Sequence, residues 1–249
     1  MHAATTSLAP VNSTRGEWAN FAAFLRRPAL PERARALRLA SLVAVWRMLL
    51  LDLAVMGVLL AIASAVIAVG VEVPQTALAG MEIGPGIVFA VVVFAPLAEE
   101  IAFRGWLSGR PGHLLGVLAL LAAVAAAMAL AGGSLERGAM HGAALAVVVG
   151  LLVALALVFA LRKRGAMRWF TALFPALFWL STLGFASVHL LNFPAAQMAM
   201  ALPLILPQFA TGMMLGYLRV HYGLWASILL HLLHNGAFLA LVWLAGGAG

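Results

Sequence analysis

The chain has 249 residues, of which 65% are hydrophobic and 9% are charged, and its mean hydropathy is +1.07. A soluble domain carries charge on roughly a quarter of its residues, so this composition excludes a water-soluble fold. The absence of cysteine excludes a disulfide framework, a thiolate metal site and a cysteine nucleophile. The net charge of +7 comes from basic clusters between apolar segments, which is typical of orientation in a bilayer rather than nucleic-acid binding.

Two segments precede the first apolar stretch. Residues 1 to about 17 are rich in Ala, Thr, Ser and Asn and predict a disordered tail. From Trp18 to Arg38, arginines alternate with Phe and Leu, which predicts a basic amphipathic segment on the cytoplasmic membrane surface. We therefore expect residues 1–38 to form this tail and segment, and residues 39–249 to form a transmembrane helical domain.

Seven apolar segments are long enough to cross a bilayer, which takes about 20 helical residues. They comprise residues 49–70, 86–107, 113–131, 139–161, 169–191, 198–218 and 223–245. This pattern predicts an all-α, polytopic membrane bundle of about seven transmembrane helices, with six to eight as the range. With the N-terminus inside, all 15 Lys and Arg residues except Arg137 fall on the cytoplasmic side. We expect an integral protein of a bacterial inner (plasma) membrane.

The second span contains two adjacent acids, which are functional candidates because ionisable groups are costly in lipid. Arg104 follows Glu100 at i+4, the spacing and order that favour an ion pair. Glu99 points about 100° away on a helix and has no local partner. It is therefore a candidate general base. A structural ion pair beside a proton-carrying acid explains the same motif equally well.

Three further polar residues lie on the fifth and seventh spans. Phe185 and His189 are spaced i, i+4 near the end of the fifth span, and His231 and Asn235 are spaced alike in the seventh. The shared face of His231 and Asn235 predicts a lined cavity. The two histidines could bind a metal with a carboxylate, or hydrogen-bond a water and an oxyanion. A histidine near a span end is also commonly a satisfied interface residue.

Other polar and small residues have simpler interpretations. Asp52 and Arg47, near the start of the first span, are expected to pair with each other or with lipid headgroups. Gly212 and Gly216 form a small-xxx-small pair, which predicts close helix packing.

The three motifs resemble those of the CPBP family, the CAAX protease and bacteriocin-processing family of intramembrane endopeptidases, which includes the Ras-converting prenyl endopeptidase. The matching patterns are Glu99-Glu100-x-x-x-Arg104, Phe185-x-x-x-His189 and His231-x-x-x-Asn235. The resemblance covers about residues 86–245.

The resemblance implies a role for each matched residue. Glu99 would activate the attacking water, Glu100 would support it with Arg104, and His189 would help to hold the water or a metal. His231 and Asn235 would stabilise the oxyanion. The candidate catalytic residues are thus Glu99, Glu100, His189, His231 and Asn235, supported by Arg104 and Phe185, and the candidate ligands of a divalent metal such as zinc are Glu99, His189 and His231. No acid lies on the fifth or seventh span, which favours catalysis without a metal.

Two features depart from the family pattern. The interval between Arg104 and Phe185 is longer than in the family, and two extra spans would account for it. His189 would also lie about 30 Å along a helix starting at Trp169, too far out to meet the other motifs. If the helix instead starts at Pro175, with residues 169–174 along the cytoplasmic interface, that distance falls to about 21 Å.

The sequence therefore predicts an intramembrane endopeptidase with a glutamate-activated water. A proton-coupled transporter is the alternative from another class, because buried acids and histidines also serve pumps. A catalytically idle scaffold or bacteriocin-immunity protein is a third, although no motif residue is lost. The expected partners are membrane lipids and a peptide or membrane-protein substrate, which could be lipidated; we expect no nucleic acid.

Overall fold

The computed structural model describes residues 13–76, 82–132 and 137–246, and every regular element in these ranges is helical. Most of the predicted tail, residues 1–12, lies outside them. Seven helical segments in the described part are long and apolar enough to cross a membrane. They comprise residues 39–68, 85–108, 111–131, 137–160, 168–192, 195–222 and 224–244. The predicted all-α membrane bundle is thus confirmed.

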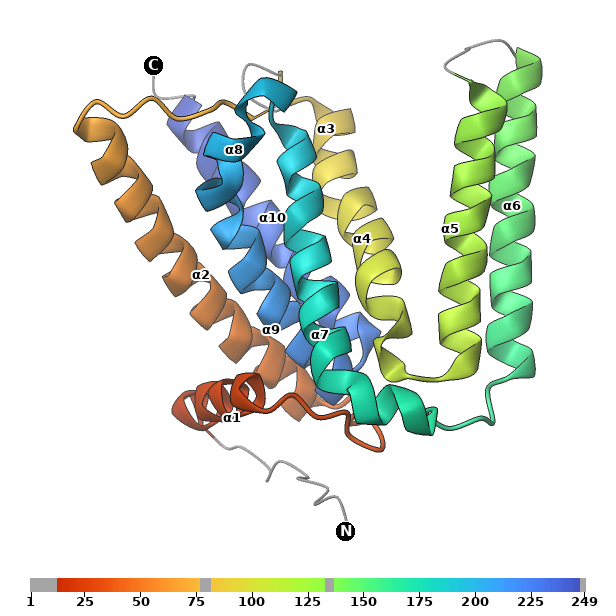
Figure 1. Cartoon of the computed structure of the whole chain (residues 1–249). Helices are drawn as coiled ribbons and strands as arrows, with labels where there is room; N and C mark the ends of the chain where they lie inside the picture. Colours follow the sequence, from red (N-terminus) through yellow and green to blue (C-terminus); the bar gives the residue numbers. More distant parts are fainter. Residues whose placement is uncertain (1–12, 77–81, 133–136, 247–249) are drawn as a thin grey trace.

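The first helix, α1 (Thr14–Arg26), lies across the bottom of the bundle in Figure 1 and begins within the stretch predicted as a tail. The Ser13 side chain caps it. Glu17 is buried and accepts hydrogen bonds from the hydroxyls of Tyr217 (2.8 Å) and Tyr222 (2.7 Å). These bonds tie α1 to the end of a later membrane helix.

The first span, α2 (Leu39–Ala68), begins earlier than the predicted residue 49. Its extra turns pack against α1, and Val45 and Met48 are buried in the shared core. At the same level the Trp18 indole N–H donates to the backbone oxygen of Arg47 at 2.8 Å. The helix therefore continues through the charged Arg47 because α1 covers this side of it.

The second span consists of α3 (Pro85–Phe89), a π-helical turn η1 (Ala90–Phe94) and α4 (Ala95–Arg104). A 3₁₀ turn, η2 (Gly105–Ser108), ends it. Ala95 donates to Ala90 in the i→i−5 register of a π-helix. The next residue, Pro96, has no N–H to donate to Val91 in the same register. This carbonyl needs a donor from elsewhere, which the last helix supplies.

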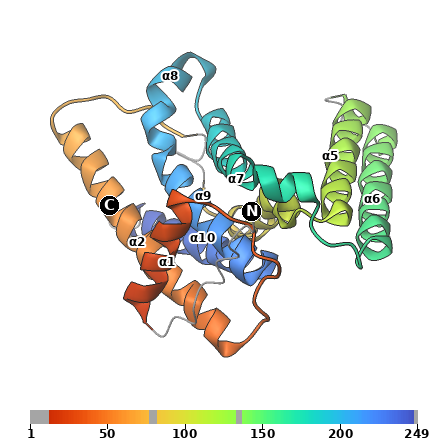
Figure 2. The same cartoon turned by 60° about the horizontal axis from the view of Figure 1, so that its bottom comes forward.

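Helices α5 (Pro111–Ala131) and α6 (Arg137–Ala160) form a hairpin that stands beside the bundle (Figures 1 and 2). The two helices approach closely because Gly150 faces Ala123; a Cβ atom at Gly150 would lie 2.1 Å from the Ala123 Cβ. These are the two spans between the first and second motifs. Two crossings return the chain to the side of the membrane from which it left. The hairpin therefore does not change the orientation of the helices that carry the motifs.

The fifth span is α7 (Arg168–Val188) followed by a 3₁₀ turn, η3 (His189–Asn192). Our prediction that this helix starts at Pro175 is wrong, because α7 is continuous through that residue. Its first turns nevertheless run along the bottom of the bundle before it turns upward (Figure 1). The proline explains such a bend, since it removes one backbone hydrogen bond within a helix.

The sixth span is broken into several turns before its long helix, α9 (Leu206–Tyr222). The preceding elements are η4 (Ala195–Gln197), α8 (Met198–Ala201) and η5 (Leu202–Ile205). Gly223, with φ of +105°, links α9 to α10 (Leu224–Gly246) in a conformation that favours glycine.

Helices α7 and α9 pack through the predicted small-residue pair. A Cβ atom at Gly216 would lie 2.6 Å from Cε2 of Phe178, and one at Gly212 would lie 3.1 Å from Cδ1 of Phe185. The packing role predicted for these glycines is confirmed. It brings α9 against the aromatic face of α7, beside the second motif.

Candidate active site

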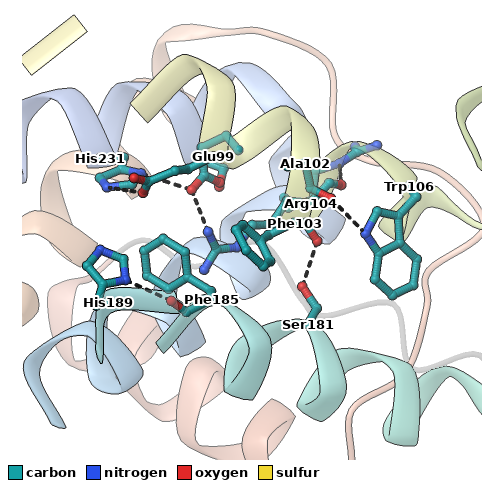
Figure 3. A network of polar contacts seen from close by, with 12 residues as sticks. Glu99, Ala102, Phe103, Arg104, Trp106, Ser181, Phe185, His189 and His231 are labelled. Atoms are coloured by element: carbon teal, nitrogen blue, oxygen red, sulfur yellow. Dashed lines mark hydrogen bonds and ion pairs between the residues drawn. The ribbon is translucent and has the colours of Figure 1, made fainter. Parts of the chain in front are cut away.

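The three sequence motifs meet inside the bundle, as Figure 3 shows for most of their residues. The carboxylates come from α4, Phe185 from the end of α7, His189 from the start of η3, and His231 from α10. Three helices that are distant in the sequence therefore contribute to one polar cluster. A straight helix starting at Trp169 would place His189 too far from the other motifs. Because α7 bends, His189 instead reaches the Phe185 ring that His231 also contacts.

The Glu100 carboxylate is buried, and both of its oxygens accept hydrogen bonds. Its Oε1 accepts from Nη1 of Arg104 at 2.7 Å and from Nδ1 of His231 at 3.0 Å. Its Oε2 accepts from the Ser227 hydroxyl. Glu100 is 0% exposed, so the guanidinium neutralises a charge that would otherwise be very costly. The i, i+4 pair predicted from the sequence is confirmed.

Glu99 is placed differently from its neighbour. Its side chain is 28% exposed, yet its Oε2 atom is buried and has no hydrogen-bond partner among the described residues. This oxygen lies 3.7 Å from Nε2 of His231. Because a carboxylate accepts only, the bond to Glu100 requires a proton on Nδ1 of His231. The Nε2 edge of the ring is therefore the one directed at Glu99.

The Phe185 ring is the centre of the cluster. The Arg104 guanidinium carbon lies 3.8 Å from its centroid, a close cation–π contact. The rings of His189 and His231 pack edge-on to it, with centroids 4.8 and 5.6 Å away. This single ring touches the cation and both imidazoles, and it is 1% exposed. Its position explains why the second motif pairs a phenylalanine with a histidine.

His189 is oriented by the backbone of its own helix. Its Nδ1 lies 2.8 Å from the carbonyl oxygen of Phe185, one turn earlier. A carbonyl oxygen accepts only, so Nδ1 carries the proton. In the neutral ring Nε2 then holds a lone pair that can accept a hydrogen bond or bind a cation.

Asn235 contacts the second span rather than another motif side chain. Its Nδ2 donates to the Val91 carbonyl at 2.8 Å, the oxygen that Pro96 leaves without a backbone donor. An amide nitrogen has two hydrogens, so the second one is available to another acceptor. Asn235 thus fixes α10 against the π-helical turn that precedes both glutamates.

Several contacts hold α4 in place. The Ser181 hydroxyl donates to the backbone oxygen of Phe103 at 2.6 Å (Figure 3). The buried Arg219 donates from Nε to the Arg104 carbonyl at 2.7 Å and from Nη2 to the Gly105 carbonyl at 3.0 Å. These bonds satisfy carbonyls at the end of the helix that carries the acids.

Sequence reasoning did not identify Ser227 as part of the site. It precedes His231 by four residues, so the same i, i+4 rule that grouped the motif residues places both on one face of α10. That spacing was the available signal.

The prediction that Asp52 pairs with Arg47 or with headgroups is wrong. Asp52 is 0% exposed and its Oδ1 accepts from the Thr211 hydroxyl at 2.8 Å. Its Oδ2 lies 2.6 Å from Nδ1 of His234. Asp52 lies on the face of α2 that packs against α9 and α10. No local spacing in the sequence reveals this long-range contact.

The candidate metal ligands do not form a metal centre in this structure. In the part of the chain that it describes, no group of three or more His, Cys, Asp or Glu side chains is placed to hold one ion. A catalytic zinc site needs three protein ligands at about 2 Å from the ion, and Glu99, His189 and His231 are not placed as such a group among the described residues. The residues therefore do not fit a zinc centre.

The fold and the site define an integral membrane protein with an acid–imidazole cluster inside a helical bundle. The family model described as type II CAAX prenyl endopeptidase Rce1-like matches residues 82–237. The chain therefore belongs to this family, whose members are intramembrane proteases. Comparison with curated proteins and with solved structures found no match. The matched region runs from just before α3 into α10 and leaves α1 and α2 outside.

Proposed function

We propose that this protein is an intramembrane endopeptidase in which Glu99 is the general base. The supporting observation is the Oε2 atom of Glu99, which is buried, has no hydrogen-bond partner among the described residues and lies 3.7 Å from Nε2 of His231. A water molecule can hydrogen-bond to both atoms across such a distance. Family membership favours hydrolysis over proton-coupled transport.

In the proposed reaction, Glu99 accepts a proton from water as the water oxygen attacks the scissile carbonyl carbon. The carbonyl π-bond electrons move to its oxygen and form a tetrahedral oxyanion. The protonated Glu99 then gives its proton to the leaving nitrogen, and the carbon–nitrogen bond breaks. The products are a carboxylic acid and an amine, and Glu99 is again a carboxylate.

Glu100 is a positioning residue in this proposal. Both of its oxygens accept hydrogen bonds within the protein and the residue is 0% exposed, so it is not placed to activate a water molecule. Its bond to Nδ1 of His231 fixes the ring and directs Nε2 toward Glu99. In this proposal Glu99 therefore accepts the proton of the water, and Glu100 orients the imidazole of His231.

The oxyanion would be stabilised by donors from α10. A doubly protonated His231 donates from Nε2, and Asn235 retains one amide hydrogen beside its bond to Val91. Across the Phe185 ring, Nε2 of His189 can accept a hydrogen bond from the attacking water. We assign no step to a metal ion, because the candidate ligands do not form a group of three around one point in the described part of the chain.

We place the α1 end of the bundle on the cytoplasmic side. Arg26, Arg27 and Arg38 are exposed there, and so are Arg162, Lys163 and Arg164 in the connection between α6 and α7, which lies at the same end in Figure 1. This distribution follows the positive-inside rule. We propose a membrane-associated peptide as the substrate.

The test is cleavage of a peptide library, with prenylated and unmodified members, by the purified full-length protein. Wild type should cleave, whereas Glu99→Gln should lose at least about 100-fold in kcat and His231→Ala a similar factor. Glu72→Gln, which changes an exposed acid outside the spans, is the control and should behave as wild type. Full activity of Glu99→Gln would reject the mechanism.

A further inference from the structure

A second carboxylate–imidazole pair lies in the bundle and plays no part in the proposed reaction. Asp52 on α2 is completely buried, and its Oδ2 lies 2.6 Å from Nδ1 of His234 on α10. Its Oδ1 accepts from Thr211 on α9 at 2.8 Å. The carboxylate therefore joins three membrane helices at one point. Asp52 lies outside the region matched by the family model.

This pair is close to the candidate site along α10. His234 follows His231 by three residues and precedes Asn235 by one. On a helix, three residues correspond to an offset of about 60° around the axis. His231 and Asn235 therefore lie on the face of α10 that contacts the second span, and His234 lies on the adjoining face, which contacts α2.

Polar contacts consequently hold α10 from two sides. Toward the second span, His231 bonds Glu100 and Asn235 bonds Val91. Toward α2, His234 bonds Asp52. Most other side chains on α10 are apolar, and in a lipid environment no hydrophobic driving force holds helices against one another. The Asp52–His234 bond is thus a directional restraint on the rotation of α10.

The rotation of α10 matters because of the short distance from His231 to Glu99. With side chains the helix has a radius of about 5–6 Å, so a rotation of 10° moves their ends by about 1 Å. A displacement of that size in catalytic groups can cost about 100-fold in rate. The Nε2 atom of His231 is now 3.7 Å from Oε2 of Glu99.

We propose that Asp52, acting through His234, is a positioning residue that sets the rotation of α10 and keeps His231 directed at Glu99. The inference rests on the proposed function for its kinetic consequence, but its structural consequence can be measured independently. Helix α2 is then part of the catalytic unit, although the family signature does not include it.

The first measurement compares cleavage by full-length variants. Asp52→Val/His234→Leu removes both partners and so leaves no unpaired buried charge. We expect kcat to fall 10- to 100-fold, with KM within about threefold of wild type and an unchanged melting temperature. Asp52→Asn can still accept from His234 and should stay within threefold of wild type. If the first double variant does not fold, Asp52→Asn/His234→Leu, which keeps a partner for Thr211, replaces it.

The second measurement does not depend on activity. The chain has no cysteine, and a Cβ atom at Gly236 would lie 3.6 Å from Cγ1 of Val92. A Val92→Cys/Gly236→Cys protein should therefore form a disulfide between α10 and the second span. We expect its yield under mild oxidation to fall at least threefold when the Asp52–His234 pair is also replaced.

Ser41→Ala is the matched control, because Ser41 is also a buried polar residue of α2 and its hydroxyl donates to the nearby Ala36 carbonyl. It should change neither kcat nor disulfide yield. Wild-type kcat and disulfide yield in the double variant would overturn the inference, and so would a loss of kcat that merely parallels a lower melting temperature. Inactive wild type, or fully active Glu99→Gln, would instead refute the proposed function, and the disulfide yield would still decide the role of Asp52.

Discussion

Nε2 of His231 lies 3.7 Å from Oε2 of Glu99, while the opposite nitrogen of the same ring is bonded to the neighbouring acid. One imidazole thus connects two adjacent carboxylates with different surroundings. Glu100 is paired and enclosed, whereas Glu99 is partly exposed and its Oε2 has no hydrogen-bond partner in the described part of the chain. Replacing each acid by glutamine should therefore affect the stability of the protein differently.

Glu100→Gln should destabilise the protein, whereas Glu99→Gln should not. The first change leaves the buried Arg104 guanidinium without its counter-charge, which typically costs about 3–5 kcal/mol. The second changes a carboxylate whose buried Oε2 has no hydrogen-bond partner among the described residues, so the melting temperature should stay the same or rise. Thermal unfolding in detergent measures both. Equal melting temperatures for the two variants would contradict the division of roles between the acids.

Arg104→Lys should lower stability by about 1–3 kcal/mol although it keeps the charge. Lysine cannot spread a planar cation over the Phe185 ring while also reaching Glu100. Arg162→Lys is a matched control, because the Arg162 guanidinium also lies 3.8 Å from a ring centroid, that of Phe159, but on an exposed surface. The control should have little effect. Similar losses in both variants would show that enclosure of the Arg104 site is unimportant.

Much of the site follows from local spacing. The i, i+4 rule identified the Glu100–Arg104 pair and grouped His231 with Asn235, because both relationships lie within one helix. The same rule applied to Ser227 would have added it. Hydropathy predicted the seven spans because each must be apolar over its whole length.

Contacts between distant helices could not be predicted in this way. Asp52 and His234 are paired by the packing of α2 against α10, and no sequence periodicity encodes the mutual rotation of two helices. Helix α2 likewise begins at Leu39 rather than at the predicted residue 49, and its first turns pack against α1, a long-range contact that hydropathy does not encode. The hydrogen bond from Asn235 to the π-helical turn before Pro96 is likewise a contact between distant helices.

Gly216→Ala should destabilise the bundle by about 1–3 kcal/mol, as overpacking in a tight core does. The added methyl group would lie 2.6 Å from Cε2 of the buried Phe178 ring, so α7 and α9 would have to separate. Gly57→Ala is the control, since a Cβ atom there meets nothing within 4 Å and alanine favours a helix. The control should be neutral or stabilising in the same unfolding assay. A neutral Gly216→Ala would show that the two helices are not in close contact.

Chelation should leave peptide cleavage unchanged. Zinc catalysis needs three protein ligands around one ion, and the described residues offer no such group near Glu99. Activity of the purified protein should therefore be equal before and after exhaustive treatment with a strong chelator, and added zinc should not increase it. Metal analysis of the active sample provides the control by showing that the ion content is far below one per chain. Loss of cleavage on chelation, with recovery on adding zinc, would mean that Glu99, His189 and His231 move together to bind a metal, and the proposed role of Glu99 as a metal-free base would be wrong.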